Sequence, residues 1–151
     1  MTTPSISTCL WYETEAEAAA LLYCSLFPDA RITLRMPQIG DPQGRAFLVE
    51  FTLMGQSYVA MNGGPHYTLS PAASIMVYVD TQAEIDHLWA TLLRGGQESR
   101  CGWLTDRYGL SWQILPRALP HMLRQDRSGG VMRAMMRMVK MDLATLQAAL
   151  G

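Results

Sequence analysis

The alternation of apolar and polar residues predicts two similar halves. Residues 6–17 read ISTCLWYETEAE and residues 74–84 read SIMVYVDTQAE. In each, a short apolar strand runs into an acidic residue and a Thr-x-x-Glu sequence, which is a capping box that starts helices. The two boxes begin at Thr14 and Thr81, 67 positions apart. Because repeated segments reveal the architecture of a fold, this pattern indicates a duplicated module.

The first half is expected to follow the order β-α-β-β-β. A strand over 6–11 leads to a helix over 15–27 that Thr14 caps, and strands follow at 30–36, 46–54 and 57–61. The predicted apolar face of the helix consists of Ala18, Leu21, Leu22, Cys24 and Leu26. The segment Asn62-Gly63-Gly64-Pro65 is expected to be a turn that ends this half.

The second half repeats the order with shorter strands. We expect a strand over 74–79, a helix over about 82–93 ending at Gly95-Gly96, and strands near 98–106 and 108–115. The helix face consists of Ile85, Leu88, Trp89 and Leu92. Beyond Pro116, a methionine-dense helix starts near 128, and Asp142 caps a last short helix. An apolar stripe is predicted on the methionine-dense helix, made of Met132, Met135, Met136, Val139 and Leu143.

Composition fits one globular domain over 1–151, because 49% of the residues are hydrophobic and 17% are charged. Within it we expect module 1 at about 5–65, module 2 at about 72–116 and a helical tail at about 117–151. No apolar run is long enough to span a bilayer. The start of the chain does not resemble a secretion signal, and the three cysteines show no CxxC spacing. These features favour a cytoplasmic protein with reduced thiols.

Charge is unevenly distributed along the chain. Residues 1–116 carry 11 acidic and 6 basic residues, whereas residues 117–151 carry 2 acidic and 6 basic ones. The basic residues of the tail alternate with Met and Leu and have no stacking aromatic among them, so nucleic-acid binding is not expected. A solvated helix face or an acidic surface on a partner subunit fits better. We therefore predict a homodimer whose interface includes residues 131–150; packing of the tail within its own chain is the alternative.

The segment from 61 to 116 contains several specific motifs. They are Met61-Asn62-Gly63-Gly64-Pro65, Cys101-Gly102-Trp103-Leu104-x-Asp106 and Gly109-x-Ser111-Trp112-Gln113-Ile114-x-Pro116. They resemble PhnB-like proteins, many of which are called 3-demethylubiquinone-9 3-methyltransferase, in the glyoxalase/bleomycin-resistance/dihydroxybiphenyl-dioxygenase (vicinal oxygen chelate) superfamily. Cys9-Leu10-Trp11-Tyr12 and Lys140-Met141-Asp142 also look like that family. The resemblance implies an α+β fold, in which two βαβββ modules form curved, mainly antiparallel sheets around a cavity, plus C-terminal helices, usually in a dimer.

The resemblance also bears on metal chemistry. Members that use a metal place His or Glu at four strand positions, which correspond here to positions near Ser7, Ala60, Ser74 and Gln113. Two hydroxyls, a methyl group and an amide do not supply the donors that a divalent ion needs. The histidines do not replace them, since His87 is expected on a helix and His66 and His121 in loops. We therefore expect no bound metal and no cofactor.

The candidate site residues are few. Cys101 is a possible nucleophile beside Arg100, although a buried structural thiol is the competing interpretation; Cys9 and Cys24 are expected in the core. The candidate ligand-binding residues are Ser7, Ser74, Gln113, Asn62, Trp11 and Trp103. They suggest that the cavity between the modules binds a small, partly apolar molecule. The alternative is an enzyme, either a methyltransferase, as the family label suggests, or a lyase or transferase that uses Cys101. The first βα turn, Tyr12-Glu13-Thr14, lacks the glycines of a nucleotide-binding turn, so the sequence does not support S-adenosylmethionine binding.

Overall fold

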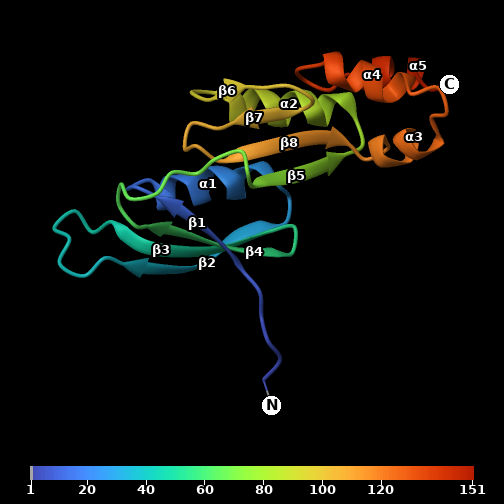
Figure 1. The fold of residues 1–151 in the computed structure, drawn as a ribbon. Helices are drawn as coiled ribbons and strands as arrows, with labels where there is room; N and C mark the ends of the chain where they lie inside the picture. Colours follow the sequence, from blue (N-terminus) through green and yellow to red (C-terminus); the bar gives the residue numbers. More distant parts are fainter. Residues whose placement is uncertain (1) are drawn as a thin grey trace. The chain divides into compact units, whose positions relative to one another are not determined.

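The computed structural model describes residues 2–151 and divides into two compact units, residues 1–69 and 70–151. Each unit contains one four-stranded mixed sheet (Figure 1). The order of elements confirms the predicted βαβββ repeat and the α+β class. Among the described residues, no helix combines the length and apolarity needed to cross a bilayer.

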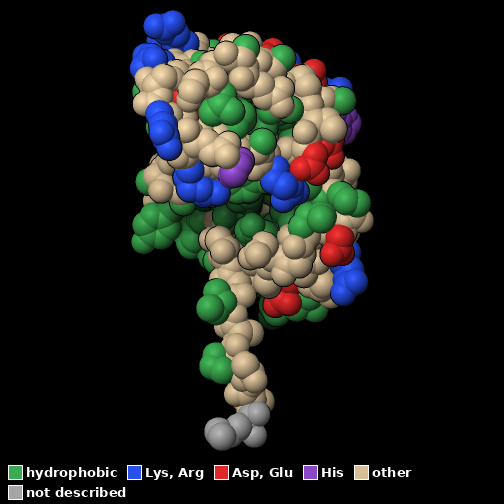
Figure 2. Space-filling view, turned by 90° about the vertical axis from the view of Figure 1, so that its right-hand side faces the viewer, with side chains coloured by type: hydrophobic (Ala, Val, Ile, Leu, Met, Phe, Trp, Pro, Cys, Tyr) green, Lys and Arg blue, Asp and Glu red, His purple; other side chains and the backbone are tan. Residues whose placement is uncertain are grey.

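Unit 1 consists of β1 (Thr8–Tyr12), α1 (Ala16–Leu26), β2 (Ala30–Pro37), β3 (Ala46–Leu53) and β4 (Gln56–Asn62), with the sheet order β1-β4-β3-β2. The pair β1–β4 is parallel and the other two pairs are antiparallel, because only β1 is separated from its neighbour by long intervening chain. Residues 2–7 precede β1 as an exposed extended segment (Figures 1 and 2).

Helix α1 packs through a different face from the one predicted. Its buried residues are Ala16, Ala19, Ala20 and Tyr23, whereas Leu21 is 56% exposed. The Tyr23 hydroxyl lies 3.1 Å from that of Tyr12 in β1, which ties the small-residue face to the sheet. Alanine allows the helix backbone to approach the strands closely. The helix therefore buries its alanine face against the sheet, although leucine side chains would bury more apolar surface.

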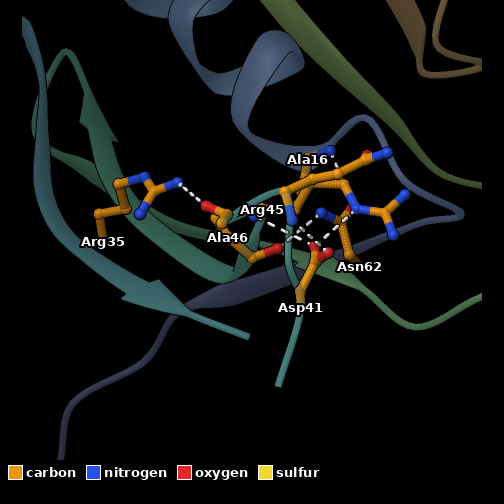
Figure 3. Close-up of polar contacts among 8 residues, drawn as sticks. Ala16, Arg35, Asp41, Arg45, Ala46 and Asn62 are labelled. Carbon is orange, nitrogen blue, oxygen red and sulfur yellow. Dashed lines mark hydrogen bonds and ion pairs between the residues drawn. The ribbon is translucent and has the colours of Figure 1, made fainter. Parts of the chain in front are cut away.

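The first capping box does not form. The helix begins after Glu15, with no side-chain cap from Thr14 or Glu15. Instead, the Ala16 N–H donates to Oδ1 of Asn62, at the end of β4, over 2.8 Å (Figure 3). The prediction for Thr14 was therefore wrong, because a side chain distant in sequence satisfies the helix end.

Unit 2 consists of β5 (Ser74–Val79), α2 (Gln82–Leu93), β6 (Gln97–Glu98), β7 (Trp103–Thr105) and β8 (Ser111–Pro116), in the sheet order β5-β8-β7-β6. The α2 predictions are confirmed: Thr81 and Glu84 form the capping box, and the helix buries the expected residues. Gly95 has a φ of +73° just beyond the helix end, where glycine is favoured. The sequence predicted two strands, near 98–106 and 108–115, whereas the structure has three short ones, β6, β7 and β8.

The tail folds as three helices of unit 2, α3 (Leu119–Gln125), α4 (Gly130–Arg137) and α5 (Leu143–Ala148). Helix α3 was not predicted, and it contains His121, which was expected in a loop. Asp142 caps α5 as predicted, by accepting from the Thr145 N–H. The continuous stripe was wrong, because α4 ends at Arg137 and leaves Val139 and Leu143 off that helix.

The tail contributes to the core of unit 2. Val131, Met141 and Leu146 have no exposed surface. Lys140 Nζ lies 2.6 Å from Oδ1 of Asp86 in α2, so one predicted attraction between the basic tail and an acidic residue occurs within unit 2. This ion pair, with a further hydrogen bond from Gln82, holds the pKa of Asp86 below its ordinary value.

Candidate functional site

Each sheet has one face against its helix and an opposite face, which we call the open face. In unit 2 the side chains alternate along β8: Trp112 and Ile114 are fully buried on the side that α2 covers. Ser111 and Gln113 therefore belong to the open face, because successive strand residues point to opposite sides.

The strand register aligns polar residues on this open face. Ser111 of β8 lies opposite Ser74 of β5 and opposite Thr105 of β7. Two residues further along β8, Gln113 lies opposite Met76 and Trp103. The structure thus brings together three residues predicted from sequence, Ser74, Gln113 and Trp103, and the Gln113 side-chain amide donates to the Ser74 hydroxyl over 2.9 Å.

Two adjoining hollows lie on this face. One, of about 250 Å³, is almost entirely apolar apart from Gln113, and it includes both Cys101 and Trp103 in its wall. Met76, Tyr78 and Leu115 of the sheet also line it, and the tail adds Leu119, Pro120, Leu123 and Met135 from α3 and α4. Sequence reasoning did not find Leu119, Pro120 and Leu123, because it did not predict α3, whereas Met135 belongs to the apolar stripe that it predicted. We call this the apolar hollow.

The second hollow, of about 260 Å³, is more polar and shares Trp103 and the neighbouring strand positions. Ser111 lines it and is only 1% exposed. Its hydroxyl oxygen has no hydrogen-bond partner among the residues that the structure describes. A buried hydroxyl without a partner costs about 1–3 kcal/mol, so a hydrogen-bonding group that reached this oxygen would stabilise the protein. We call this the polar hollow.

Asp106 supports the start of β8, next to Ser111 and the polar hollow. It is 3% exposed; its Oδ1 accepts from the Tyr108 and Leu110 N–H groups at 2.8 and 3.1 Å, and its Oδ2 accepts from Trp112 Nε1 at 2.9 Å. This arrangement explains why Trp112 is a core residue and does not face a ligand. It also closes the turn around Gly109, whose φ is +89°.

Cys101 lies in a turn before β7 with a φ of +59°, and it is partly buried. Its thiol contacts the thioether of Met136, with 3.8 Å between Sγ and Sδ. The other thiols differ from prediction: Cys9 is exposed and Cys24 is partly exposed, not core. Partial burial raises the pKa of both the Cys9 and the Cys24 thiol above the ordinary 9.0.

In unit 1, the predicted residues Trp11 and Asn62 line one hollow of about 550 Å³, with Glu13, Arg45 and Phe47. The polar side-chain atoms of Trp11 and Asn62 make hydrogen bonds within unit 1. Trp11 Nε1 donates to the Gly64 carbonyl at 2.9 Å, and its ring stands edge-on to Tyr67. Besides accepting from Ala16, Asn62 donates through Nδ2 to the Ala46 carbonyl at 2.8 Å (Figure 3).

These bonds give Asn62 a structural role, in which its Oδ1 and its Nδ2 each make one hydrogen bond within unit 1. The glycine turn after it is also used internally, since the Gly63 N–H donates to the Tyr12 carbonyl. A Cβ at Gly63 would overlap the Trp11 ring, so glycine is needed there for close approach. The hollow keeps Arg45 and Glu13 as its charged members, and Arg45 Nε is paired with Asp41 at 2.7 Å.

The four strand positions do not fit a divalent metal. Ser7 is exposed and its hydroxyl accepts from Ser57, and Ser74 accepts from Gln113. Ala60 is fully buried on the helix side of its sheet, so the position assigned to it was wrong. In unit 1, Ser57 lies beside Ser7, just as Ser111 lies beside Ser74 in unit 2. Two residues further along each strand, Val59 is therefore the counterpart of Gln113. The assignment to Ala60 was one residue off, and a shift of one residue turns a side chain to the other face of the sheet. Among residues 2–151, no three His, Cys, Asp or Glu side chains cluster as metal ligands.

Comparison with known proteins now places the chain. Residues 4–115 match the family model described as 3-demethylubiquinone-9 3-methyltransferase. The chain belongs to this family. It is PhnB-like and a member of the vicinal oxygen chelate superfamily. The matched segment ends at residue 115, so α3–α5, including the Lys140-Met141-Asp142 segment noted above, lie outside it. No curated protein sequence matches the chain.

Solved structures agree with the fold. The chain is similar to the PhnB protein of Bacillus cereus, which has the provisional description 3-demethylubiquinone-9 3-methyltransferase, with 30% identity and a TM-score of 0.69 over 75% of this chain and 99% of that one. It resembles protein PA1353 of Pseudomonas aeruginosa at 18% identity and a TM-score of 0.64, covering 76% and 98% of the two chains. The fosfomycin resistance protein FosX of Listeria monocytogenes is 12% identical with a TM-score of 0.52, covering 77% and 94%. The last two likenesses concern the fold alone.

Proposed function

We propose that this family member binds a small, partly apolar molecule on the open face of its second sheet, without a divalent ion at the four strand positions. The observation that carries this proposal is the unpartnered hydroxyl of Ser111, which lines the polar hollow. A ligand oxygen or nitrogen would satisfy that hydroxyl and recover the cost of its burial.

The neighbouring apolar hollow determines the other half of the ligand. Trp103 forms part of the wall of both hollows. The rest of the apolar hollow is lined by Met, Leu, Pro, Tyr and Cys side chains and by the single amide of Gln113. Binding sites are commonly apolar with a few placed polar groups. The expected ligand therefore has one hydrogen-bonding end near Ser111 and an apolar body that passes Trp103.

Native mass spectrometry of the purified protein gives the first test, because a retained ligand adds a defined mass to the chain. The second test uses an anilinonaphthalene sulfonate dye, which joins an apolar ring system to a polar group. Met76→Glu places a charge on the wall of the apolar hollow and is expected to weaken dye binding at least fivefold. The matched control is Met132→Glu, since Met76 and Met132 are 48% and 46% exposed and only Met76 lines the hollow.

Dye affinity unchanged by Met76→Glu would contradict the proposal. Ser111→Ala tests the polar hollow separately from the apolar one. It should weaken dye binding, or release a copurified ligand, while the circular dichroism spectrum stays that of the wild type. If Ser111→Ala only stabilises the protein and leaves binding unaltered, the hydroxyl is a structural defect and not a ligand contact.

The alternative that the protein is an enzyme rests on the family description, which names a methyltransferase. A methyl transfer would require a donor, and we expect no measurable affinity for S-adenosylmethionine, because β1 leads into Tyr12-Glu13-Thr14 without a glycine-rich turn. A micromolar isotherm in calorimetry would favour the transferase. Cys101→Ala tests a reaction through the thiol. The three free cysteines fit the cytoplasmic location that we propose.

We also propose a homodimer. The tail stripe no longer supports it in full, but unit 1 has an apolar cluster around the β2–β3 connection. Leu34, Met36, Ile39 and Phe47 are 42%, 44%, 100% and 38% exposed, and the last three border an apolar hollow of about 500 Å³. A two-fold interface uses the same patch on both copies, so an exposed knob beside an apolar hollow suits self-association.

A further inference from the structure

The hollow of about 550 Å³ in unit 1 has one cation and one anion in its wall, Arg45 and Glu13, together with apolar side chains that include Trp11 and Met61. We propose that this hollow is a second binding site, which takes a zwitterionic molecule with an apolar body, such as a free amino acid with an apolar side chain. The site lies within unit 1 and shares no residue with the two hollows of unit 2.

A nearly buried carboxylate orients Arg45. The Asp41 side chain is 4% exposed, and its Oδ2 accepts from Arg45 Nε at 2.7 Å (Figure 3). The Arg45 side chain, with the Gln43 N–H, holds the pKa of the Asp41 carboxyl below its ordinary value, so the pair stays charged at neutral pH. Asp41 does not line the hollow. The ion pair therefore orients the guanidinium without adding a negative charge to the wall.

The two terminal nitrogens of Arg45 remain for a ligand. Neither has a hydrogen-bond partner among residues 2–151, and 49% of the side chain is exposed. An arginine fork binds a carboxylate through two parallel hydrogen bonds, and such charge-assisted bonds are stronger than those between neutral groups. Arg45 therefore presents a carboxylate site at the wall of the hollow.

Hydrogen bonds also hold the loop that carries Arg45. The Gln38 N–H donates to the Arg45 carbonyl at 2.9 Å, which joins the two ends of the β2–β3 connection. Within that connection, Arg35 Nη2 donates to the Gly44 carbonyl at 2.7 Å, and the Arg45 N–H donates to Asp41 Oδ2 at 3.1 Å. Gln38 lines the hollow as well. The loop thus presents an arginine and an amide from a backbone that is held at several points.

Trp11 provides an apolar wall whose orientation is likewise held. Its Nε1 donates to the Gly64 carbonyl, and its ring stands edge-on to Tyr67 with 4.9 Å between the ring centroids. Met61 adds a thioether side chain to the same wall. Small-molecule sites usually measure about 300–1,000 Å³ and combine apolar walls with a few placed polar groups, which describes this hollow.

Glu13 favours a zwitterion over a simple carboxylate. A ligand with a carboxylate alone would be repelled by the Glu13 charge, whereas an ammonium group on the same ligand would be attracted to it. The charges of the wall, +1 on Arg45 and −1 on Glu13, sum to zero, which matches a ligand without net charge. A free amino acid with an apolar side chain has the carboxylate, the ammonium and the apolar body.

The first test compares three ligands on the wild-type protein. Calorimetry should show saturable binding of L-phenylalanine. Binding should be at least tenfold weaker for phenylalaninamide, which lacks the carboxylate, and at least threefold weaker for N-acetylphenylalanine, which lacks the ammonium. This comparison does not depend on the folding of a variant. Equal affinity for L-phenylalanine and either derivative, or no saturable binding of L-phenylalanine, would overturn the proposal.

Variants then test the two charged residues. Arg45→Lys keeps a cation beside Asp41 but removes the fork, so it should bind L-phenylalanine at least fivefold more weakly. Glu13→Gln should weaken binding at least threefold. The matched controls are Arg31→Lys and Glu15→Gln, which alter exposed residues outside the hollow and should leave binding unchanged. Wild-type affinity in Arg45→Lys would make Arg45 a solvated loop residue and overturn the proposal.

Nuclear magnetic resonance locates the ligand. The indole N–H signal of Trp11, assigned with Trp11→Phe, should shift on addition of L-phenylalanine, while that of Trp112 in the core of unit 2 should stay in place. Met76→Glu should bind L-phenylalanine as the wild type does, so the result is independent of the dye experiment. A shift at Trp103 without one at Trp11 would place the ligand in unit 2 and overturn the proposal.

Discussion

Asn62, the last residue of β4, accepts a hydrogen bond from the backbone N–H of Ala16, the first residue of α1, over 2.8 Å. The same side chain donates to the Ala46 carbonyl at the start of β3. One amide thus joins the helix end to two strands of the unit 1 sheet.

Replacing Asn62 tests this arrangement. Asn62→Ala leaves the helix end and a strand carbonyl without their partner, so the free energy of unfolding should fall by about 1–3 kcal/mol. Thr14→Ala should change it by less than about 0.5 kcal/mol, because surface changes away from caps have little effect. Urea unfolding followed by circular dichroism measures both. Equal losses for the two variants would mean that Thr14 caps the helix in solution.

Asp106 is expected to be the most sensitive polar residue of unit 2. An amide in Asp106→Asn presents a donor to one of the N–H groups that the carboxylate accepts from, so the variant should lose about 2–3 kcal/mol. Trp112 fluorescence should shift, since its indole N–H loses a charged acceptor. Glu98→Gln, on the exposed strand β6, is the control for the loss of a charge. An unchanged unfolding midpoint in Asp106→Asn would contradict the network.

The capping box of α2 should make the stability of the fold depend on pH in the acidic range. The Thr81 backbone N–H and hydroxyl donate to Glu84 and hold the pKa of its carboxyl below the ordinary 4.5. Since the folded pKa is depressed, the stabilisation is complete above 4.5 and is lost as the pH falls through the folded value. Glu84→Gln retains an acceptor but removes the titration, so its midpoint should decline less between pH 5 and pH 3.

Asp142 adds to this acid dependence by the same mechanism. Hydrogen bonds from Thr145 to its carboxylate at the start of α5 lower the pKa of Asp142 below 3.8. The double variant Glu84→Gln/Asp142→Asn should therefore have a flatter profile than either single one. Profiles parallel to that of the wild type would show that these caps do not titrate with folding.

Light scattering should give about twice the chain mass of 16.8 kDa if the proposed homodimer forms. Ile39→Asp puts a charge on the fully exposed apolar side chain beside the unit 1 hollow, and the mass should fall toward that of one chain. Ile6→Asp, which alters the 89% exposed Ile6 of the N-terminal segment, is the control. Truncation after Pro120 would be a poor test of the dimer, because it removes Val131, Met141 and Leu146, which are buried in unit 2.

Elemental analysis checks the metal prediction. The donor set Ser7, Ala60, Ser74 and Gln113 should leave the purified protein without stoichiometric Zn, Ni, Mn or Fe, and Val59 in place of Ala60 does not improve it. Near-equimolar amounts of any of these ions, retained after dialysis, would reopen a metal-dependent reaction.

The sequence by itself determined the local elements and their order. Alternation fixed most strands, Thr81 and Glu84 fixed the start of α2, and spacing fixed its buried face, because these features depend on neighbours within four or five residues. The family motifs between residues 61 and 116 indicated the fold correctly, and the family model matches residues 4–115.

Tertiary structure decided what depends on contacts between distant residues. Asn62 replaced Thr14 as the helix cap across 46 positions, and the Tyr12–Tyr23 contact rotated α1 onto its alanine face. The register of β5, β8 and β7 put Ser74, Ser111 and Thr105 in one row, and α3 with α4 enclosed the apolar hollow. Strand register and helix rotation are set by which side chains pack together, and a residue pattern along one element does not contain that information.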